Sequence, residues 1–291
     1  MTERDAWFFP HAKPLVKKQK TLVMGIVNMT PDSFSGRNAA RTPKDAVALA
    51  TEMLANGADM IDIGAESSRP GAGVLTAEEE RFRIGDAVAR LRDSTDAPIS
   101  VDTYHAETAA EVLRQGADII NDITALRGNW APMDRASSEM AKLVAEHNAH
   151  VVLMHMPAAP AAMQRDIEYG DVVAEVREFL RDQAEFAQRS GINADNIWLD
   201  PGFGFGKDFR HNRELLLHLG VIADLGYPVL AGLSRKRMIY DVLQLPPEDR
   251  LEGSLALAVI ASLSGADILR VHDVLPTARA LAMADAVSSE E

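Results

Sequence analysis

The stretch NGADMIDIG, residues 56–64, returns in two altered copies, QGADIINDI at 115–123 and SGADILRVH at 264–272. Each copy places Gly-Ala-Asp between the end of an amphipathic segment and the start of a short apolar run. Glycine commonly ends a helix, and a short apolar run is typical of a buried strand. A repeated joint between helix and strand predicts a closed, repetitive α/β architecture.

Short apolar runs alternate with longer amphipathic segments along most of the chain. The apolar runs, each expected to be a buried parallel strand, cover residues 21–28, 59–64, 98–102, 118–123, 150–155, 196–200, 228–234 and 267–273. The amphipathic segments, each expected to be helical, cover residues 43–57, 76–93, 106–116, 136–148, 169–191, 212–226, 235–265 and 276–289. This alternation predicts a (β/α)8 TIM barrel, with a doubly wound open sheet as the alternative.

The domain organisation is expected to be simple. No stretch rich in Pro, Gly or Ser divides the chain, so we expect a single barrel domain over residues 21–291. Residues 1–20 are expected to form a short N-terminal arm.

Composition excludes several classes of function. The chain has 291 residues, no cysteine and a formal net charge of -13. The lack of cysteine excludes disulfides and thiolate metal sites, and the negative charge opposes binding to nucleic acid. No apolar run approaches the roughly 20 residues of a membrane span, and the first residues lack the apolar core of a signal peptide. We therefore expect a cytoplasmic enzyme without nucleic-acid or membrane partners.

The stretch LDPGFGFGKD, residues 199–208, is similar to a phosphate-binding loop without matching a known one. A Walker loop needs glycine where Pro201 stands, and Ser or Thr where Asp208 follows the lysine. The dinucleotide fingerprint needs glycine at the position of Lys207. The function of this stretch must therefore be inferred from its surroundings.

Polar side chains stand at the end of every expected strand. They are Asn28, Asp62, Asp102, Asn121, His155, Asp200, Ser234, and the pair Arg270 and His272. In a barrel these strand ends share one rim, where active sites lie. The carboxylates suit the N–H donors of a nitrogen-rich heterocycle. The basic residues near the rim suit phosphate oxygens, and they are Arg69, Lys207, Arg235, Lys236, Arg270 and His272.

At these residues the sequence resembles the dihydropteroate synthases, folate-pathway enzymes of the pterin-binding barrel family. The resemblance runs from about Leu22 to the C-terminus. It rests on the motifs GIVNMTPDSFS, DIGAESSRPGA, ISVDTY, IINDI, VVLMHM followed by MQ, LDPGFGFGK, GLSRKR and RVHDV, in this order along the chain.

The resemblance implies a reaction, a cofactor and an assembly. A dihydropterin diphosphate would lose diphosphate, and the amine of 4-aminobenzoate would take its place on the exocyclic carbon. The family is thought to ionise the carbon–oxygen bond before the amine attacks, with Mg²⁺ at the leaving group. Its members are usually homodimers, and they are the target of sulfonamides, which mimic 4-aminobenzoate.

Carried over position by position, the resemblance also implies site residues. The catalytic residues would be Lys236, Asp102 and Arg270, and the pterin contacts Asp102, Asn121, Met154, Asp200, Phe205, Gly232 and Lys236. The diphosphate contacts would be Asn28, Arg69, Arg270 and His272, and the 4-aminobenzoate contacts Ser68, Arg69, Pro70 and Arg237. The metal ligands would be Asn28 and Asp32.

The sequence also departs from the family pattern. GRNAAR at 36–41 stands where the family usually has Asp-Gly-Gly, and Ser68 stands where it usually has Thr. Two alternatives therefore stay open. One is a methyltetrahydrofolate-binding methyltransferase domain, which shares the barrel but needs no diphosphate site. The other is a non-catalytic pterin-binding homologue that acts through partners.

Overall fold

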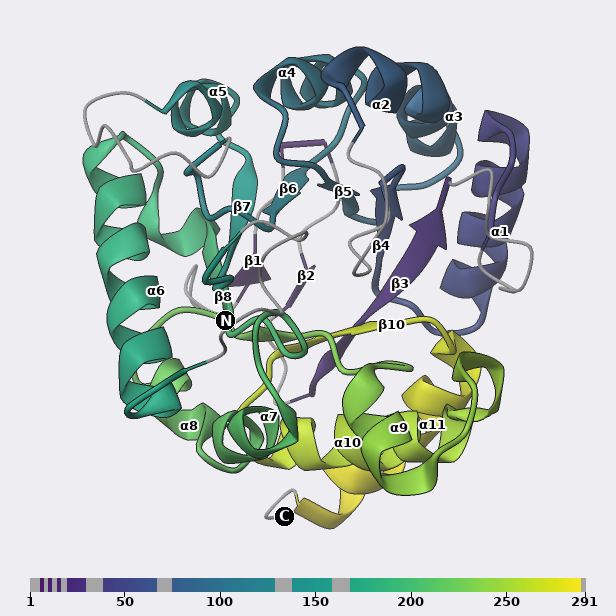
Figure 1. Ribbon diagram of the computed structural model, residues 1–291. Coiled ribbons are helices and arrows are strands. Elements are labelled where there is room, and N and C mark those ends of the chain that lie inside the picture. The colour runs from purple at the N-terminus through teal and green to yellow at the C-terminus, as the bar shows by residue number, and fades with distance from the viewer. Residues whose placement is uncertain are drawn as a thin grey trace.

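The centre of the molecule is a barrel of parallel strands, in a computed structural model that describes residues 6–7, 10–11, 15–16, 20–29, 39–66, 75–128, 138–158 and 168–288. The strands are β3 (Leu22–Asn28), β4 (Met60–Gly64), β5 (Ile99–Asp102), β6 (Ile119–Asp122), β7 (His150–Met154), β8 (Ile197–Asp200), β9 (Leu230–Ala231) and β10 (Ile268–Val271). Their order is β8-β7-β6-β5-β4-β3-β10-β9, and a parallel bridge between Leu199 and Val229 joins the two ends. The prediction of a (β/α)8 barrel is confirmed, and the open-sheet alternative is wrong (Figure 1).

Helices surround this barrel (Figure 1). They are α1 (Pro43–Ala55), α2 (Ala77–Ile84), α3 (Ala87–Arg92), α4 (Ala106–Arg114), α5 (Glu139–Glu146), α6 (Val172–Arg189), α7 (Phe209–Leu217), α8 (Leu219–Ala223), α9 (Arg237–Leu243), α10 (Leu251–Leu263) and α11 (Val274–Ser288). Residues 76–93, expected as one helical unit, form α2 and α3 instead. Gly85 between them adopts a φ of 54°, which ends the first helix.

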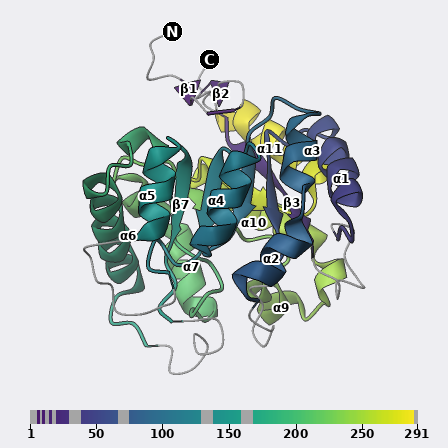
Figure 2. The same cartoon turned by 90° about the horizontal axis from the view of Figure 1, so that it is seen from above.

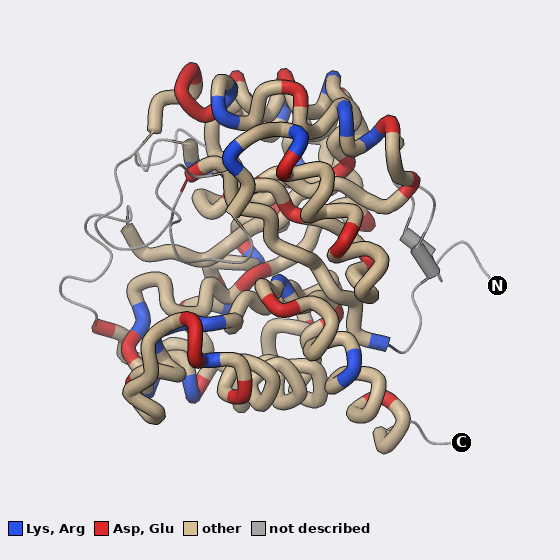
Figure 3. Tube along the Cα trace, turned by 90° about the vertical axis from the view of Figure 1, so that its right-hand side faces the viewer, with Lys and Arg blue, Asp and Glu red and all other residues tan. Residues whose placement is uncertain are grey.

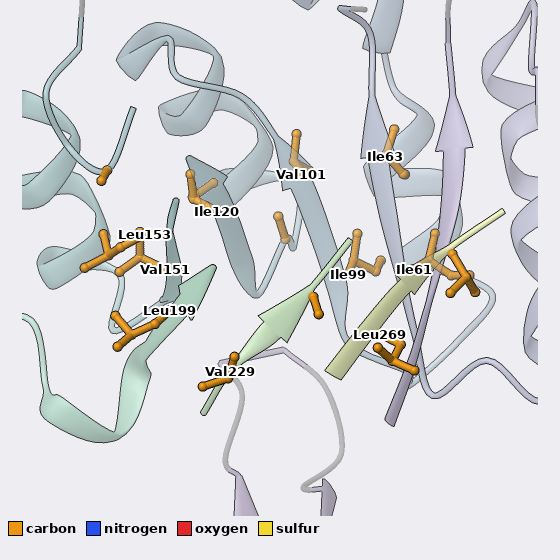
Figure 4. Packing of buried hydrophobic residues seen from close by; sticks show 14 of the residues in the cluster. Ile61, Ile63, Ile99, Val101, Ile120, Val151, Leu153, Leu199, Val229 and Leu269 are labelled. Carbon is orange, nitrogen blue, oxygen red and sulfur yellow. The ribbon is translucent and has the colours of Figure 1, made fainter. Parts of the chain in front are cut away.

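Two apolar cores lie on the two sides of the strands. The core inside the barrel consists of Leu22, Met24, Met60, Ile119, Val152, Trp198, Leu230 and Ile268. The larger core lies between the strands and the helices and includes Ile61, Ile63, Val101, Ile120, Val151, Leu153, Leu199 and Leu269 (Figure 4). Inward and outward residues alternate along each strand because successive strand side chains point to opposite faces.

The N-terminal residues contain a feature that the sequence did not predict. β1 (Ala6–Trp7) pairs antiparallel with β2 (Leu15–Val16), and two-residue strands are too short to show a period of two. The backbone N–H of His11 donates a hydrogen bond to Oδ1 of Asp118 at 2.8 Å. Because Asp118 precedes β6, this contact places the hairpin at the amino ends of the strands (Figure 2).

Charged residues are distributed over the helices of the outer layer (Figure 3). Among the helices that the structure describes, none is long and apolar enough to cross a membrane.

Candidate active site

The strand geometry brings polar side chains together inside the carboxyl end of the barrel. Asp62, Asn121, Asp200 and Arg270 each stand two positions after an inward member of the inner core: Met60, Ile119, Trp198 and Ile268. Because strand side chains alternate, they point inward again, one layer higher. Asp62 is 0%, Asn121 3% and Asp200 6% exposed. A buried polar layer therefore covers the apolar inner core.

Arg270 lies at the centre of this layer. Its Nε donates to Oδ2 of Asp62 at 2.6 Å, and a terminal nitrogen donates to Oδ2 of Asp102 at 2.8 Å. Asp62 also accepts from Ser100 Oγ at 2.6 Å and from Asn121 Nδ2 at 3.4 Å. Burial by itself would lower the pKa of Arg270, but the two carboxylates outweigh it and the pKa is raised. Arg270 therefore stays charged.

Asp102 borders a second group of acidic side chains. Together with Thr103, Ile123 and Tyr104 it lines a small cavity, whose other lining residues are Glu66 and Glu80. Glu80 Oε2 accepts from Thr103 Oγ1 at 2.6 Å, and the Tyr104 hydroxyl donates to Glu66 at 3.2 Å. Burial raises the pKa of Glu66 and Glu80, and it raises the pKa of Asp102 to about 7 although Arg270 opposes the shift.

Sequence reasoning predicted Asp102 but missed the two glutamates beside it. Glu66 lies within a motif that carried the family resemblance, but no role was inferred for it. Glu80 follows two other glutamates in TAEEER, a pattern typical of the solvated first turn of a helix. Yet Glu80 is 0% exposed. The polar hydroxyls of Thr103 and Tyr104 just after Asp102 were the one signal in the sequence.

Lys236 and Asp200 lie close enough for each charge to shift the pKa of the other group. Lys236 Nζ donates to the backbone oxygen of Phe203 and lies 4.4 Å from the centre of the Phe205 ring. Burial lowers the pKa of Lys236 to about 8, and Asp200 opposes that shift. Burial raises the pKa of Asp200, and Lys236 opposes it in turn. Each of these two charges therefore stabilises the charged form of the other in a poorly hydrated environment.

Further predicted contacts of the pterin line the same region. Met154 is buried and packs in one cluster with Ile123 and Met156, against which Phe205 lies. Gly232 has no Cβ, and a Cβ built there would lie 3.7 Å from Lys236 Nζ and 4.0 Å from Arg270 Cβ. Gly232 therefore lies beside the Lys236 ammonium and the base of the Arg270 side chain.

Lys207 and Arg235 do not lie where a rim cation would be free to bind phosphate. Lys207 is 4% exposed, and its Nζ donates to the backbone oxygens of Gly202 and Phe205, both at 3.1 Å. Arg235 forms a two-bonded ion pair with Asp273, at 2.9 and 2.6 Å. The stretch at 199–208 is therefore a turn held from within by its own lysine.

The remaining predicted residues lie at the margin of the site or outside the described chain. Asn28 is half-buried at the end of β3, and His272 Nδ1 lies 3.0 Å from Ser234 Oγ. The side chain of Arg237 is 84% exposed and pairs with Asp241 at 3.4 Å. Asp32, Ser68, Arg69 and Pro70 lie outside the residues that the structure describes.

Comparisons with known proteins identify the family and agree with the fold. The family model described as "Pterin binding enzyme" matches residues 24–272. The dihydropteroate synthase of Bacillus subtilis is 42% identical over 279 residues, which cover 95% of this chain and 93% of that protein. A crystal structure of Yersinia pestis dihydropteroate synthase in a sulfonamide drug complex superposes with a TM-score of 0.90 at 37% identity, covering 98% of this chain and 100% of that one. The Xanthomonas albilineans dihydropteroate synthase with 4-aminobenzoic acid gives 0.86 at 41% identity, with the same coverage.

The fold and the site define a TIM-barrel protein with a buried polar layer at the carboxyl ends of its strands, where enzymes of this fold have their active sites. The family model and the relatives narrow that class. The chain belongs to the pterin-binding enzyme family and, within it, to the dihydropteroate synthases, which are transferases of folate synthesis.

Proposed function

We propose that this protein joins 7,8-dihydropterin-6-ylmethyl diphosphate to 4-aminobenzoate, giving 7,8-dihydropteroate and diphosphate. The observation that carries the proposal is the mixed charge of the rim, where Arg270 bridges Asp62 and Asp102 while Lys236 lies near Asp200. A ring with N–H donors suits the carboxylates, and a diphosphate suits the cations. One substrate therefore satisfies both kinds of side chain.

The charges of these side chains follow the charges of the reaction. The bond between the exocyclic carbon and the diphosphate oxygen breaks, and its electron pair leaves with diphosphate. Asp102 and Asp200 would stabilise the positive charge that develops on the pterin, while Arg270, Lys236 and His272 would stabilise the departing diphosphate. The amine nitrogen of 4-aminobenzoate then bonds to the carbon and gives its proton to water.

Mg²⁺ is the proposed cofactor, and the described residues are compatible with it. Asn28 offers an amide oxygen at the rim, and Asp32 is the second proposed ligand. Within the described ranges, no three His, Asp or Glu side chains form a metal-binding group. Mg²⁺ commonly takes one or two protein ligands and completes its shell with water and substrate phosphates. When bound, it would neutralise charge on the leaving diphosphate.

The 4-aminobenzoate contacts are proposed from the family resemblance. Ser68, Arg69 and Pro70 would close over the ring, and the first turn of α9 with Arg237 would receive the carboxylate. The sulfonamide complex of the Yersinia pestis relative supports the proposal that sulfonamides compete for the same place in this protein.

A homodimer is the proposed assembly. α10 packs against both α9 and α11, and these helices carry exposed apolar side chains: Tyr240, Val242, Leu243, Ile260, Leu263, Leu275, Met283 and Val287. Exposed apolar side chains on neighbouring helices suit a protein–protein interface. Light scattering on the purified protein would test it, and Leu263→Glu is expected to shift the mass toward the monomer.

Two broader expectations stay proposals. We propose that residues 21–291 act as one domain and that residues 1–20 are an arm, which limited proteolysis would test. We also propose a cytoplasmic location, which fractionation of expressing cells would test.

A coupled assay of diphosphate release is the central experiment. The purified protein is given the dihydropterin diphosphate and 4-aminobenzoate with Mg²⁺, and dihydropteroate is measured by chromatography. We expect diphosphate and dihydropteroate in equal amounts, and neither when 4-aminobenzoate is left out. Pterin binding without product would instead support a non-catalytic homologue, and transfer of a methyl group from methyltetrahydrofolate would support the methyltransferase alternative.

A further inference from the structure

Lys207 is a buried cation that the proposed reaction does not use. Its Nζ lies within hydrogen-bond distance of four acceptors. They are Nδ1 of His155 at 2.9 Å, and the backbone oxygens of His155 at 3.3 Å and of Gly202 and Phe205 at 3.1 Å. An ammonium has three N–H donors, so these acceptors saturate it. Among the described residues, none of these bonds goes to a carboxylate.

The four acceptors belong to two segments that meet at the rim. We call residues 155–158 the β7 loop and residues 201–208 the β8 turn. Gly202 has a φ of 67°, and a Cβ built on it would lie 2.0 Å from the backbone oxygen of His155. Only glycine permits that approach. The same oxygen accepts from Lys207, so the ammonium lies at the junction between the two segments.

The two segments carry part of the proposed pterin site. Met154 directly precedes the β7 loop, and Asp200 directly precedes the β8 turn. Asp200 Oδ1 accepts from the backbone N–H of Gly202 at 2.7 Å, and Phe205 lies within the turn against the cluster that contains Met154. The positions of the Asp200 carboxylate and the Phe205 ring therefore depend on the path of this turn.

Lys236 holds the same turn from the ligand side. It donates to the backbone oxygen of Phe203 and lies over the ring of Phe205. The proposed function gives Lys236 a role at the substrate, and a turn of this side chain toward the diphosphate would take its donor away from Phe203. Lys207 is buried behind the turn and can keep its bonds to Gly202 and Phe205 in both states.

Burying the ammonium of Lys207 at this junction costs desolvation free energy, which a side chain that only filled space would not need to meet. Burial lowers the pKa of Lys207 to about 7. Burial, followed by the charge of Lys207, lowers the pKa of His155 well below its ordinary range, so the imidazole is neutral and its Nδ1 can accept. An apolar side chain would avoid the desolvation of a cation. The hydrogen bonds that Lys207 donates to the β7 loop and the β8 turn explain better why a lysine stands here.

We propose that Lys207 is a positioning residue for the pterin, which fixes Asp200 and Phe205 by holding the β8 turn against the β7 loop. The proposal rests on the proposed function, because the pterin is its ligand. It predicts that loss of the donors of Lys207 weakens pterin binding more than it weakens the binding of 4-aminobenzoate.

The test compares Lys207→Met and Lys207→Arg with the control Lys142→Met, which changes an exposed lysine on α5. The affinity of a 6-hydroxymethyl-7,8-dihydropterin without diphosphate is measured by calorimetry, and KM and kcat are measured for both substrates. We expect Lys207→Met to weaken pterin affinity about tenfold, or ~1.4 kcal/mol, with less than about a threefold change in KM for 4-aminobenzoate. We expect Lys207→Arg to recover part of the loss and Lys142→Met to show none.

A folded Lys207→Met variant with pterin affinity within about twofold of the native protein would overturn the proposal. Equal losses for both substrates would also overturn it, because they indicate a general defect. If Lys207→Met does not fold, His155→Phe carries the test, since it removes one acceptor and keeps an aromatic ring beside Phe179. A folded His155→Phe with unchanged pterin affinity would count against the junction. Failure of the proposed function is separate, because it appears as absent pterin binding or product in the native protein.

Discussion

Two groups of buried charged side chains at the rim differ in the partners that stabilise their charge. The cationic side, which we define as Lys207, Lys236 and Arg270, gives each cation backbone oxygens or carboxylates as acceptors. The acidic side, which we define as Glu66, Glu80 and Asp102, has hydroxyl donors for the two glutamates and a cation for Asp102 alone. Oε1 of Glu80 has no hydrogen-bond partner among the residues that the structure describes.

The partners on each side determine how burial changes the pKa of its charged groups. Burial favours the uncharged form of both kinds of group, so the pKa of a buried lysine falls and the pKa of a buried carboxyl rises unless partners oppose the shift. On the cationic side, the two carboxylates raise the pKa of Arg270, which keeps its charge, whereas burial lowers the pKa of Lys236 to about 8 and that of Lys207 to about 7. The acidic side, with the pKa of Asp102 raised to about 7 by burial, responds to pH near neutrality.

Replacing Lys236 should have the largest effect, because it removes a cation of the cationic side that faces the ligand. We expect Lys236→Ala to lower kcat/KM by about a hundredfold to a thousandfold, or ~2.7–4 kcal/mol, as for other preorganised charges at a reacting centre. Steady-state kinetics with circular dichroism would measure this, with Lys142→Ala as the control on α5. A well-folded variant of unchanged catalytic efficiency would remove Lys236 from the site.

Asp200→Asn should have the next largest effect. Among the described residues no ion pair is formed by Asp200, so its carboxylate can accept hydrogen bonds from the pterin. The amide keeps one acceptor oxygen and loses the charge. We expect pterin affinity to fall about thirtyfold, or ~2 kcal/mol. Calorimetry with a pterin lacking diphosphate would measure it, with Asp224→Asn on the surface as the control. An affinity within about twofold of the native value would mean that Asp200 shapes the turn only.

Glu80→Gln tests whether the charge of Glu80 raises the pKa of Asp102. The negative charge of Glu80 is one of the causes that raise the pKa of Asp102, after burial and Asp62. The native enzyme should lose activity as pH falls through about 7, because protonated Asp102 loses the charge that pairs with Arg270 and that would stabilise the positive pterin. Removing the Glu80 charge lowers the pKa of Asp102 and moves this loss to lower pH.

At a pH of about 6, the Glu80→Gln variant should therefore keep about three times more of its maximal activity than the native enzyme does. A pH profile of kcat/KM measures the effect. Glu78→Gln is the matched control, because Glu78 is exposed on the same helix. Identical acid limbs in the two variants would show that Glu80 does not act on Asp102.

Arg237→Ala should have the smallest effect and marks the outer limit of the cationic side. Its side chain is 84% exposed, so solvent screens its charge. We expect KM for 4-aminobenzoate to rise about twofold with kcat unchanged, and Arg213→Ala on α7 to change neither. A KM that does not move would exclude Arg237 from the 4-aminobenzoate site.

Much of the fold and part of the site could be predicted from sequence. The eight strands were predicted because short apolar runs between amphipathic segments report directly on burial. Asp102, Asn121, Asp200 and Arg270 were expected at one rim, and the structure places them there. Lys207 was expected among cations that suit phosphate, but it is buried, because its side chain turns back to the carbonyls of its own loop.

By itself, the sequence determined the barrel, the family and the order in which polar residues end the strands. These properties depend on local periodicity and on motifs, which lie within short stretches of chain. The tertiary structure alone decided which charges meet. Arg270 is 208 residues from Asp62 and 168 from Asp102 along the chain, yet it bonds to both. Glu80 reaches Asp102 only because α2 packs its buried face against the turn after β5. Such contacts form when the strands align and exclude water. The resulting loss of hydration shifts the pKa of each buried group, and no local sequence pattern encodes it.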